Sequence, residues 1–252
     1  MSIKELVEQK AELIAIKKGA TKCVEGGLNS ISKSVNSLSN KSVFKDGDNS
    51  LERTIIGNTY YWMDSHDDVH GKGCFAKSIK ENKAFHLHDH EFKITSRVGK
   101  PIKTYEQEIS WKELGVDKNG TTEALFVDSN ILKSFNAQIF DAYKNNEINQ
   151  HSVGMQYVKI DLAVNDEQYE EEYKVWTDNI DKLGNPQRAT EKGFFWLVRE
   201  AKLIEISAVL LGSNELTPTM GENKQADLES LAKTEADNKS LQLTQLLTNI
   251  KI

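Results

Sequence analysis

The chain has 252 residues, of which 28% are charged and 38% are hydrophobic, and its formal net charge is -6 at pH 7. That length can bury a substantial core, in one large domain or two small ones. The acidic balance argues against a general nucleic-acid binder, which normally presents a basic face. No apolar run approaches the ~20 residues of a membrane span, and the N-terminus lacks the apolar core of a signal peptide. We therefore expect a cytoplasmic protein with neither nucleic acid nor membrane as a partner.

The first 50 residues predict a helical, low-complexity extension. Ser2 and Glu5 have the spacing of a capping box, and apolar residues then recur at helical spacing. A helix is expected over residues 2–18, with Gly19 as its stop. Residues 26–49 are rich in Ser, Asn, Lys and Gly, and we expect at most a loosely ordered helix there.

The folded domain is expected over residues 51–218. Its composition alternates between β-branched or aromatic runs and turn residues, which predicts a β-rich block. Strands are expected at 53–63 with a bend at Gly57, at 84–90, 92–98, 102–109 and 123–127, from 149 onward, and at 194–211. Helices are expected at 74–81 and 129–145. The acidic stretch between 164 and 192 predicts an irregular, solvated insertion, and residues 219–252 predict a detachable helical tail.

Ser152 is the first candidate for chemistry. In an extended chain side chains alternate between faces, so Ser152 and Gly154 point one way while Val153 and Met155 form the core face. A glycine inside a strand often marks the close approach of a ligand or another backbone. Ser152 is therefore a candidate nucleophile in a groove, although Ser-x-Gly alone is a common and weak pattern.

The segment Phe85-His86-Leu87-His88-Asp89-His90 is the second candidate. If it is extended, its three histidines share one face. A His-x-His pair on a strand can bind zinc, but His86 and His90 would lie about 13 Å apart at the rise of a strand, too far to share one ion. As a partner for Ser152, His88 is the preferred general base, and His86 and His90 remain open as alternatives.

Glu205 is the candidate third member. It lies in an apolar strand, where glutamate is depleted, and a carboxylate that points inward is costly unless it is paired. An imidazolium would be such a partner. An exposed edge position for Glu205 is the competing interpretation.

Four groups of short segments follow one another along the chain. The first is Ile56-Gly57-Asn58-Thr59 through Asp64-Ser65-His66-Asp67-Asp68-Val69 with Gly73-Cys74-Phe75, and the second is Phe85-His86-Leu87-His88-Asp89 with Val98-Gly99-Lys100-Pro101-Ile102. The third is Gln150-His151-Ser152-Val153-Gly154-Met155, and the fourth is Ile204-Glu205-Ile206-Ser207-Ala208-Val209 with Gly212-Ser213-Asn214. Together they resemble the prohead (capsid maturation) proteases of tailed bacteriophages, a family related to the herpesvirus assemblin-type serine proteases. The resemblance implies an α+β fold: a small, mostly antiparallel β-barrel surrounded by helices, here with helical N- and C-terminal extensions.

The same resemblance implies a serine endopeptidase with Ser152 as nucleophile, His88 as base and Glu205 as third member, and without a metal or cofactor. Its substrates would be phage scaffold protein, major capsid protein and the protease itself, cleaved in the host cytoplasm inside the assembling procapsid, where the chain would self-associate. Two other hypotheses stay open. One is a metal-dependent hydrolase or metal-binding β-barrel that uses the cluster from His86 to His90. The other is a non-enzymatic capsid-assembly or scaffold protein that works through its terminal helices.

Overall fold

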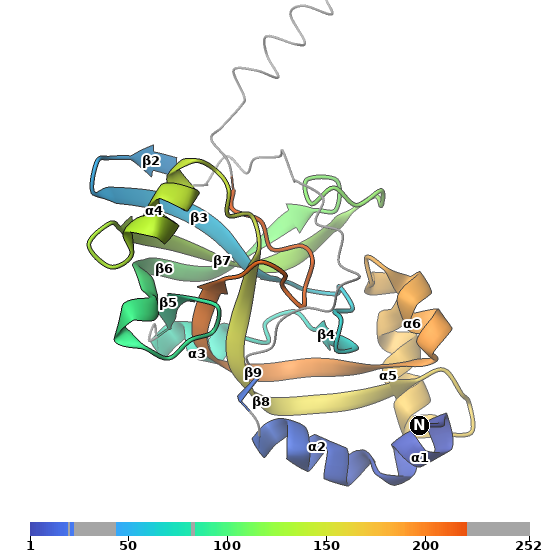
Figure 1. Cartoon of the computed structure of the whole chain (residues 1–252). Helices are drawn as coiled ribbons and strands as arrows, with labels where there is room; N and C mark the ends of the chain where they lie inside the picture. The colour runs from blue at the N-terminus through green and yellow to red at the C-terminus, as the bar shows by residue number, and fades with distance from the viewer. Residues whose placement is uncertain (20, 23–43, 82–83, 221–252) are drawn as a thin grey trace, which may run out of the picture.

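The computed structural model describes residues 1–19, 21–22, 44–81 and 84–220 and shows an α+β protein with a large, mostly antiparallel sheet (Figure 1). The predicted tail beyond residue 220 and the predicted low-complexity stretch up to residue 43 lie outside the described residues. The strands are β1 (Thr21–Lys22), β2 (Phe44–Asp46), β3 (Ser50–Thr59), β4 (Asp68–His70), β5 (Phe85–His88), β6 (Arg97–Ser110), β7 (Thr121–Leu132), β8 (His151–Val164) and β9 (Phe194–Ala208). The helices are α1 (Ile3–Glu8), α2 (Lys10–Gly19), α3 (Ala76–Glu81), α4 (Ala137–Lys144), α5 (Glu170–Asn179) and α6 (Pro186–Lys192).

Within the described chain, nine strands form one sheet. Eight of them follow the order β1-β8-β9-β5-β6-β7-β3-β2, and β4 pairs with β9 as well. The pairings of β4 and β5 with β9 are parallel, and the other ladders are antiparallel. The predicted bend at Gly57 is confirmed, because the β3–β7 register shifts between Ile56 and Asn58. A Cβ at Gly57 would lie 3.3 Å from Val153 Cγ1 and 3.5 Å from Ile206 Cγ1. The sheet therefore curls until β3 packs against β8 and β9 across the core.

The curled sheet does not close into the expected barrel. Closure would require β3 to pair with β8, and no such ladder occurs in the described residues. A short segment, Thr217–Met220, lies between these two strands instead. On the β3 side Ile56 N donates to Pro218 O at 3.0 Å, and on the β8 side His151 N donates to Thr217 Oγ1 at 3.1 Å. The sheet is thus open, and its two edges are bridged by this C-terminal segment.

The N-terminal residues pack on the folded domain. The predicted capping box is present, with Ser2 N donating to Glu5 Oε2 at 2.8 Å and Glu5 N donating to the Ser2 hydroxyl at 3.3 Å. The expected single helix is divided at Gln9 into α1 and α2, and Leu6 is buried in the main core. On α2, Lys17 Nζ lies 2.8 Å from Asp68 Oδ1. Figure 1 shows both helices beneath the β8–β9 hairpin.

The expected irregular insertion between 164 and 192 is wrong. The segment forms α5, a 3₁₀ turn (Ile180–Lys182) and α6, which begins at Pro186, a residue suited to the first turn of a helix. Trp176 and Leu183 are buried with Phe195 in a separate apolar cluster. The missed signal is an apolar stripe at helical spacing, Tyr173, Trp176, Ile180 and Leu183, set within a strongly acidic stretch.

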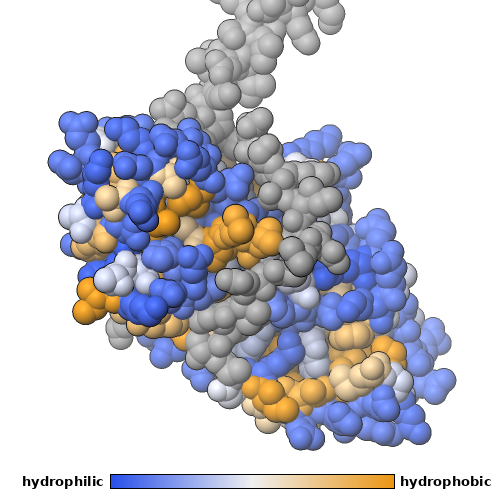
Figure 2. All heavy atoms as spheres, viewed as in Figure 1, coloured by the Kyte–Doolittle hydropathy of each residue, from blue (hydrophilic) through white to orange (hydrophobic). Residues whose placement is uncertain are grey.

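The predicted helix at 129–145 begins too early. Strand β7 continues to Leu132, and Ile131 pairs with both β3 and β6, so this side chain is buried by the sheet rather than by a helix. Helix α4 starts only after Asn136, whose side-chain oxygen accepts from Ile139 N at 3.1 Å. Among the described residues, none of the helices has the length and hydrophobicity needed to span a membrane. On the face shown in Figure 2, apolar residues form separate groups within a largely hydrophilic surface.

Candidate functional site

Ser152 lies near the start of β8, and three further residues of the β8–β9 ladder are placed near it. In the β8–β9 ladder, Ser152 is directly opposite Ser207 and Gly154 is directly opposite Glu205. Residues opposite one another project from the same side of a sheet, and successive residues alternate. These four positions therefore share one side of the sheet, which we call the Ser152 face.

Glu205 is fully buried on this face, with 0% of its surface exposed. Its side chain lies across the neighbouring strand, because a Cβ on Gly154 would come within 2.1 Å of Glu205 Oε1. The space beside Ser152 that the sequence predicts is thus filled by a carboxylate. Glu205 Oε1 lies 2.6 Å from His90 Nδ1, and Oε2 accepts from the Ser207 hydroxyl at 2.5 Å. Glu205 is thus a buried carboxylate paired with an imidazole, that of His90 rather than His88, and the exposed-edge interpretation is wrong.

His90 reaches Glu205 through a sharp turn after β5. Asp89 and His90 both have positive φ, 52° and 56°, a region that residues other than glycine seldom occupy. The turn ends the extended segment and brings His90 onto the Ser152 face, where its backbone N–H donates to Ser207 Oγ at 3.1 Å. Because the carboxylate of Glu205 can only accept, Nδ1 carries the imidazole proton. His90 Nε2 is then the basic nitrogen, and it is buried without a hydrogen-bond partner among the described residues.

His88, the predicted base, projects from the opposite face. In the parallel β5–β9 ladder His88 is opposite Ala208, which is itself opposite His151 in β8. Its Nδ1 lies 2.9 Å from Asp89 Oδ2. The register thus separates His88 from Ser152, and the histidine that joins Glu205 is His90, one of the two alternatives that the sequence left open.

His86 and His151 belong to a third environment, a buried network on the core side. His151 Nδ1 lies 2.8 Å from Thr217 O, a carbonyl that can only accept, so Nδ1 carries the proton and Nε2 accepts from Tyr143 OH at 2.7 Å. The Tyr143 oxygen then accepts from His86 Nε2 at 3.1 Å, and His86 Nδ1 accepts from the Ser129 hydroxyl at 2.8 Å. The chain of four bonds therefore runs in one direction, with both imidazoles neutral.

Burial favours these neutral forms. It lowers the pKa of His86 to about 3, aided by the nearby His151, and it lowers the pKa of His151 to about 4 despite the hydrogen bond to Thr217. Both nitrogens of each ring are engaged, so neither ring has a lone pair available for substrate or metal.

The three histidines of the 86–90 segment thus do not converge. His86 lies in the buried network, His88 pairs with Asp89, and His90 pairs with Glu205. In the part of the chain that the structure describes, no group of three or more His, Cys, Asp or Glu side chains is arranged to hold a metal ion. The expectation that the three histidines share one face is wrong, because the turn at Asp89 breaks the strand.

Ser152 completes the site. It is 5% exposed, and its hydroxyl has no hydrogen-bond partner among the described residues. The Ser152 face therefore carries a hydroxyl, an imidazole whose Nε2 is free, and a carboxylate that holds the imidazole's other nitrogen, and among the described residues no hydrogen bond joins Ser152 to His90. This is the set of groups that nucleophilic catalysis by serine requires. Sequence reasoning missed Ser207, although its position two residues after Glu205 already indicates that it shares the Glu205 face.

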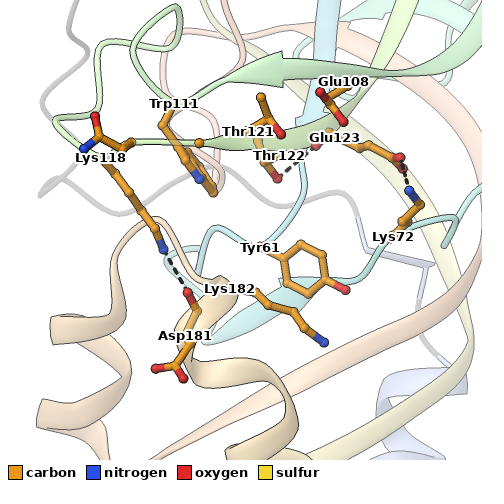
Figure 3. Close-up of a pocket in the computed structure, with 12 residues that line it drawn as sticks. Tyr61, Lys72, Glu108, Trp111, Lys118, Thr121, Thr122, Glu123, Asp181 and Lys182 are labelled. Atoms are coloured by element: carbon orange, nitrogen blue, oxygen red, sulfur yellow. Dashed lines mark hydrogen bonds and ion pairs between the residues drawn. The ribbon is translucent and has the colours of Figure 1, made fainter.

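Two hollows lie away from this set of residues. One, of about 310 Å³, is lined by the β6–β7 hairpin and the 3₁₀ turn after α5 (Figure 3). Within it Lys72 forms an ion pair with Glu123, and Lys118 donates to the backbone carbonyl of Asp181. The other, of about 190 Å³, is lined by His88, Asp89 and residues that flank β8 and β9. Neither hollow is lined by Ser152, His90 or Glu205.

Comparison of the chain with protein-family models, with curated proteins and with solved structures finds no match in any of the three. The resemblance to the prohead proteases therefore rests on the four short segments of this chain.

Proposed function

We propose that the chain is a serine endopeptidase in which Ser152 is the nucleophile, His90 the general base and Glu205 the residue that orients the base. One observation carries the proposal: His90 Nδ1 is bound to the fully buried Glu205 at 2.6 Å, while His90 Nε2 is buried and has no partner among the described residues. A buried polar atom without a partner is costly. This nitrogen is therefore free to take a proton from a nucleophile on the same face.

The mechanism follows from these roles. As Ser152 Oγ attacks a peptide carbonyl, His90 Nε2 takes its proton and later delivers it to the leaving amine. Glu205 keeps the proton of the resting imidazole on Nδ1 and stabilises the imidazolium that forms. Water then hydrolyses the acyl-enzyme with His90 acting again as base. In this assignment His90 replaces His88, and Ser152 and Glu205 keep the roles that the family resemblance implies.

The biological role is the finer part of the proposal. The four segments that resemble prohead proteases support cleavage of phage scaffold and capsid proteins, and of the chain itself, inside a procapsid. The curled sheet is compatible with the barrel-type fold that the resemblance implies, although it is open and Thr217–Met220 bridges the edges that a closed barrel would pair. A metal-dependent hydrolase finds no support in the separated histidines. A non-enzymatic scaffold role leaves the unpartnered His90 Nε2 without an explanation.

The test is phosphonylation of purified protein by a fluorophosphonate reagent, in which the serine oxygen displaces fluoride from phosphorus, with the modified residue identified by mass spectrometry. We expect one label on Ser152 and none in Ser152→Ala. His90→Ala should slow the labelling by about 100- to 10,000-fold, the usual contribution of a general base.

The matched control is His88→Ala, which removes a neighbouring histidine from the opposite face. It should label within a few-fold of the wild-type rate. Rapid labelling of His90→Ala together with loss in His88→Ala would return the base to His88. Co-expression with scaffold and capsid proteins then tests the biological role, since their processing should stop in Ser152→Ala.

A further inference from the structure

Ser207 makes two hydrogen bonds that the three proposed catalytic residues do not account for. Its hydroxyl donates to Glu205 Oε2 at 2.5 Å and accepts from the backbone N–H of His90 at 3.1 Å. Glu205 and Ser207 lie two residues apart on the same face of β9, whereas His90 comes from the turn after β5. The Ser207 side chain thus forms hydrogen bonds both to the Glu205 carboxylate and to the backbone of His90.

Each bond meets a specific physical need. The Glu205 carboxylate is fully buried, and among the described residues the Ser207 hydroxyl is the side-chain donor to its second oxygen, so losing this bond would leave a buried charged acceptor unsatisfied. The turn at Asp89 and His90 holds two consecutive non-glycine residues at positive φ. Such strain persists only where the surroundings fix the backbone firmly. The bond from His90 N to Ser207 Oγ is one of those constraints.

We propose that Ser207 is a positioning residue, which rests on the proposed function: it fixes Glu205 and the His90 backbone together, so that the imidazole is held on the Ser152 face with its proton on Nδ1. Ser207 does not touch the substrate in this role. Its hydroxyl is already used in both directions, and the residue is fully buried. It acts on the reaction through Glu205 and His90.

The test compares Ser207→Ala with Ser78→Ala. Ser78 is a suitable control because its hydroxyl also bonds to β9, accepting from Leu203 N at 2.8 Å. Leu203 lies two residues before Glu205, so the control removes a serine hydroxyl beside the same strand while leaving the bonds of Glu205 intact. Thermal melts show whether the two variants lose similar stability.

Two readouts separate positioning from general stability. The first is the rate of fluorophosphonate labelling at Ser152, which Ser207→Ala should lower by about 10- to 100-fold, as is typical when a residue behind a reacting group is removed. The second is the downfield proton NMR signal of His90 Nδ1–H, assigned by its absence in His90→Ala. That signal should shift or broaden in Ser207→Ala and stay in place in Ser78→Ala.

The two proposals fail in different ways. If wild-type protein is not labelled at Ser152, the proposed peptidase is wrong, and the NMR comparison still decides the role of Ser207. If wild-type protein is labelled and Ser207→Ala matches Ser78→Ala in both rate and NMR signal, the positioning role is overturned while the peptidase stands.

Discussion

Gly154 is required by the position of the Glu205 side chain rather than by its own backbone conformation. Its φ is not in the positive region, yet a Cβ would lie within 2.8 Å of three Glu205 atoms, as close as 2.1 Å to Oε1. Contacts this short force one of the two groups to move. Because Glu205 is fixed by His90 and Ser207, the displaced group would be part of the proposed site.

We therefore predict that Gly154→Ala lowers stability by about 1–3 kcal/mol and abolishes labelling at Ser152, because the carboxylate can no longer cross β8 to hold His90. Chemical denaturation and the fluorophosphonate assay measure the two effects. Gly19→Ala is the control, since among the described residues a Cβ there would meet no atom within 4 Å apart from its chain neighbours and the backbone of its own helix. A Gly154→Ala protein that labels at the wild-type rate would show that Glu205 does not need its observed position.

For single residues, the sequence shows which residue types are unusual in a strand better than it shows where their side chains point. Ser152 and Glu205 could be chosen because a hydroxyl beside a glycine and a carboxylate among β-branched residues are each unusual inside a strand. The choice between His88 and His90 could not be made by counting alternation. It depends on the turn at Asp89, where two non-glycine residues adopt positive φ. Asp and His are among the residue types that tolerate this region, but their presence alone does not place a turn at this point of the chain.

Between elements, the buried network joins β5, β7, α4, β8 and the segment after β9. It contains His86, Tyr143 and His151, linked end to end by hydrogen bonds. The network explains why His151 is not the base for its neighbour: its ring is turned to the core and both of its nitrogens are bonded. The same bonds fix the start of β8, which carries Ser152.

The network predicts a pH dependence of stability. In the unfolded chain each histidine takes a proton near pH 6.5, whereas the folded protein keeps His151 neutral to about pH 4 and His86 neutral to about pH 3. The unfolded state therefore binds more protons below pH 6.5, and stability falls as the pH is lowered toward 4. Each histidine contributes a slope of up to about 1.4 kcal/mol per pH unit.

Urea denaturation between pH 7 and pH 5 measures this slope. The informative comparison is with His86→Gln, which keeps a donor and an acceptor but cannot titrate in this range. We expect the variant to be less stable at pH 7 and to have a shallower slope by about 1 kcal/mol per pH unit. An unchanged slope would mean that His86 is not held neutral by the fold.

Secondary structure follows from the sequence where the apolar period is strong and local. The bend at Gly57 and the capping box at Ser2 are recovered because the residues involved determine local geometry directly. Strand β7 is misassigned beyond Ser129, because Ile131 and Leu132 fit a helical stripe as well as a strand. Only the pairing of β7 with β3 and β6 decides between them, and that pairing is a property of the assembled sheet.

For the whole molecule, the open sheet raises the question of what holds its edges together. The segment Thr217–Met220 bonds to β3 through Ile56 and Thr54, and to β8 through His151. Thr219 Oγ1 also donates to Ile148 O at 2.7 Å, just before β8. This closure was not predictable, because the segment contains a proline and forms an isolated bridge rather than a strand. The expected domain end at residue 218 falls inside it.

Two truncations test this bridging role. A chain that ends after Met220 keeps the whole segment, whereas one that ends after Pro218 loses Thr219, the buried Met220 side chain and the bond from Met220 N to Thr54 O at 2.9 Å. Burial of a methionine stabilises by about 1.5–3 kcal/mol, so the shorter chain should be less stable by at least that amount and should melt at a lower temperature.

The shorter chain should also label more slowly at Ser152, because Thr217 would be less firmly held against His151, the residue before the nucleophile. Equal stability of the two truncated chains would show that the curled sheet keeps its shape without the bridge, and that packing of β3 against β8 and β9 is sufficient.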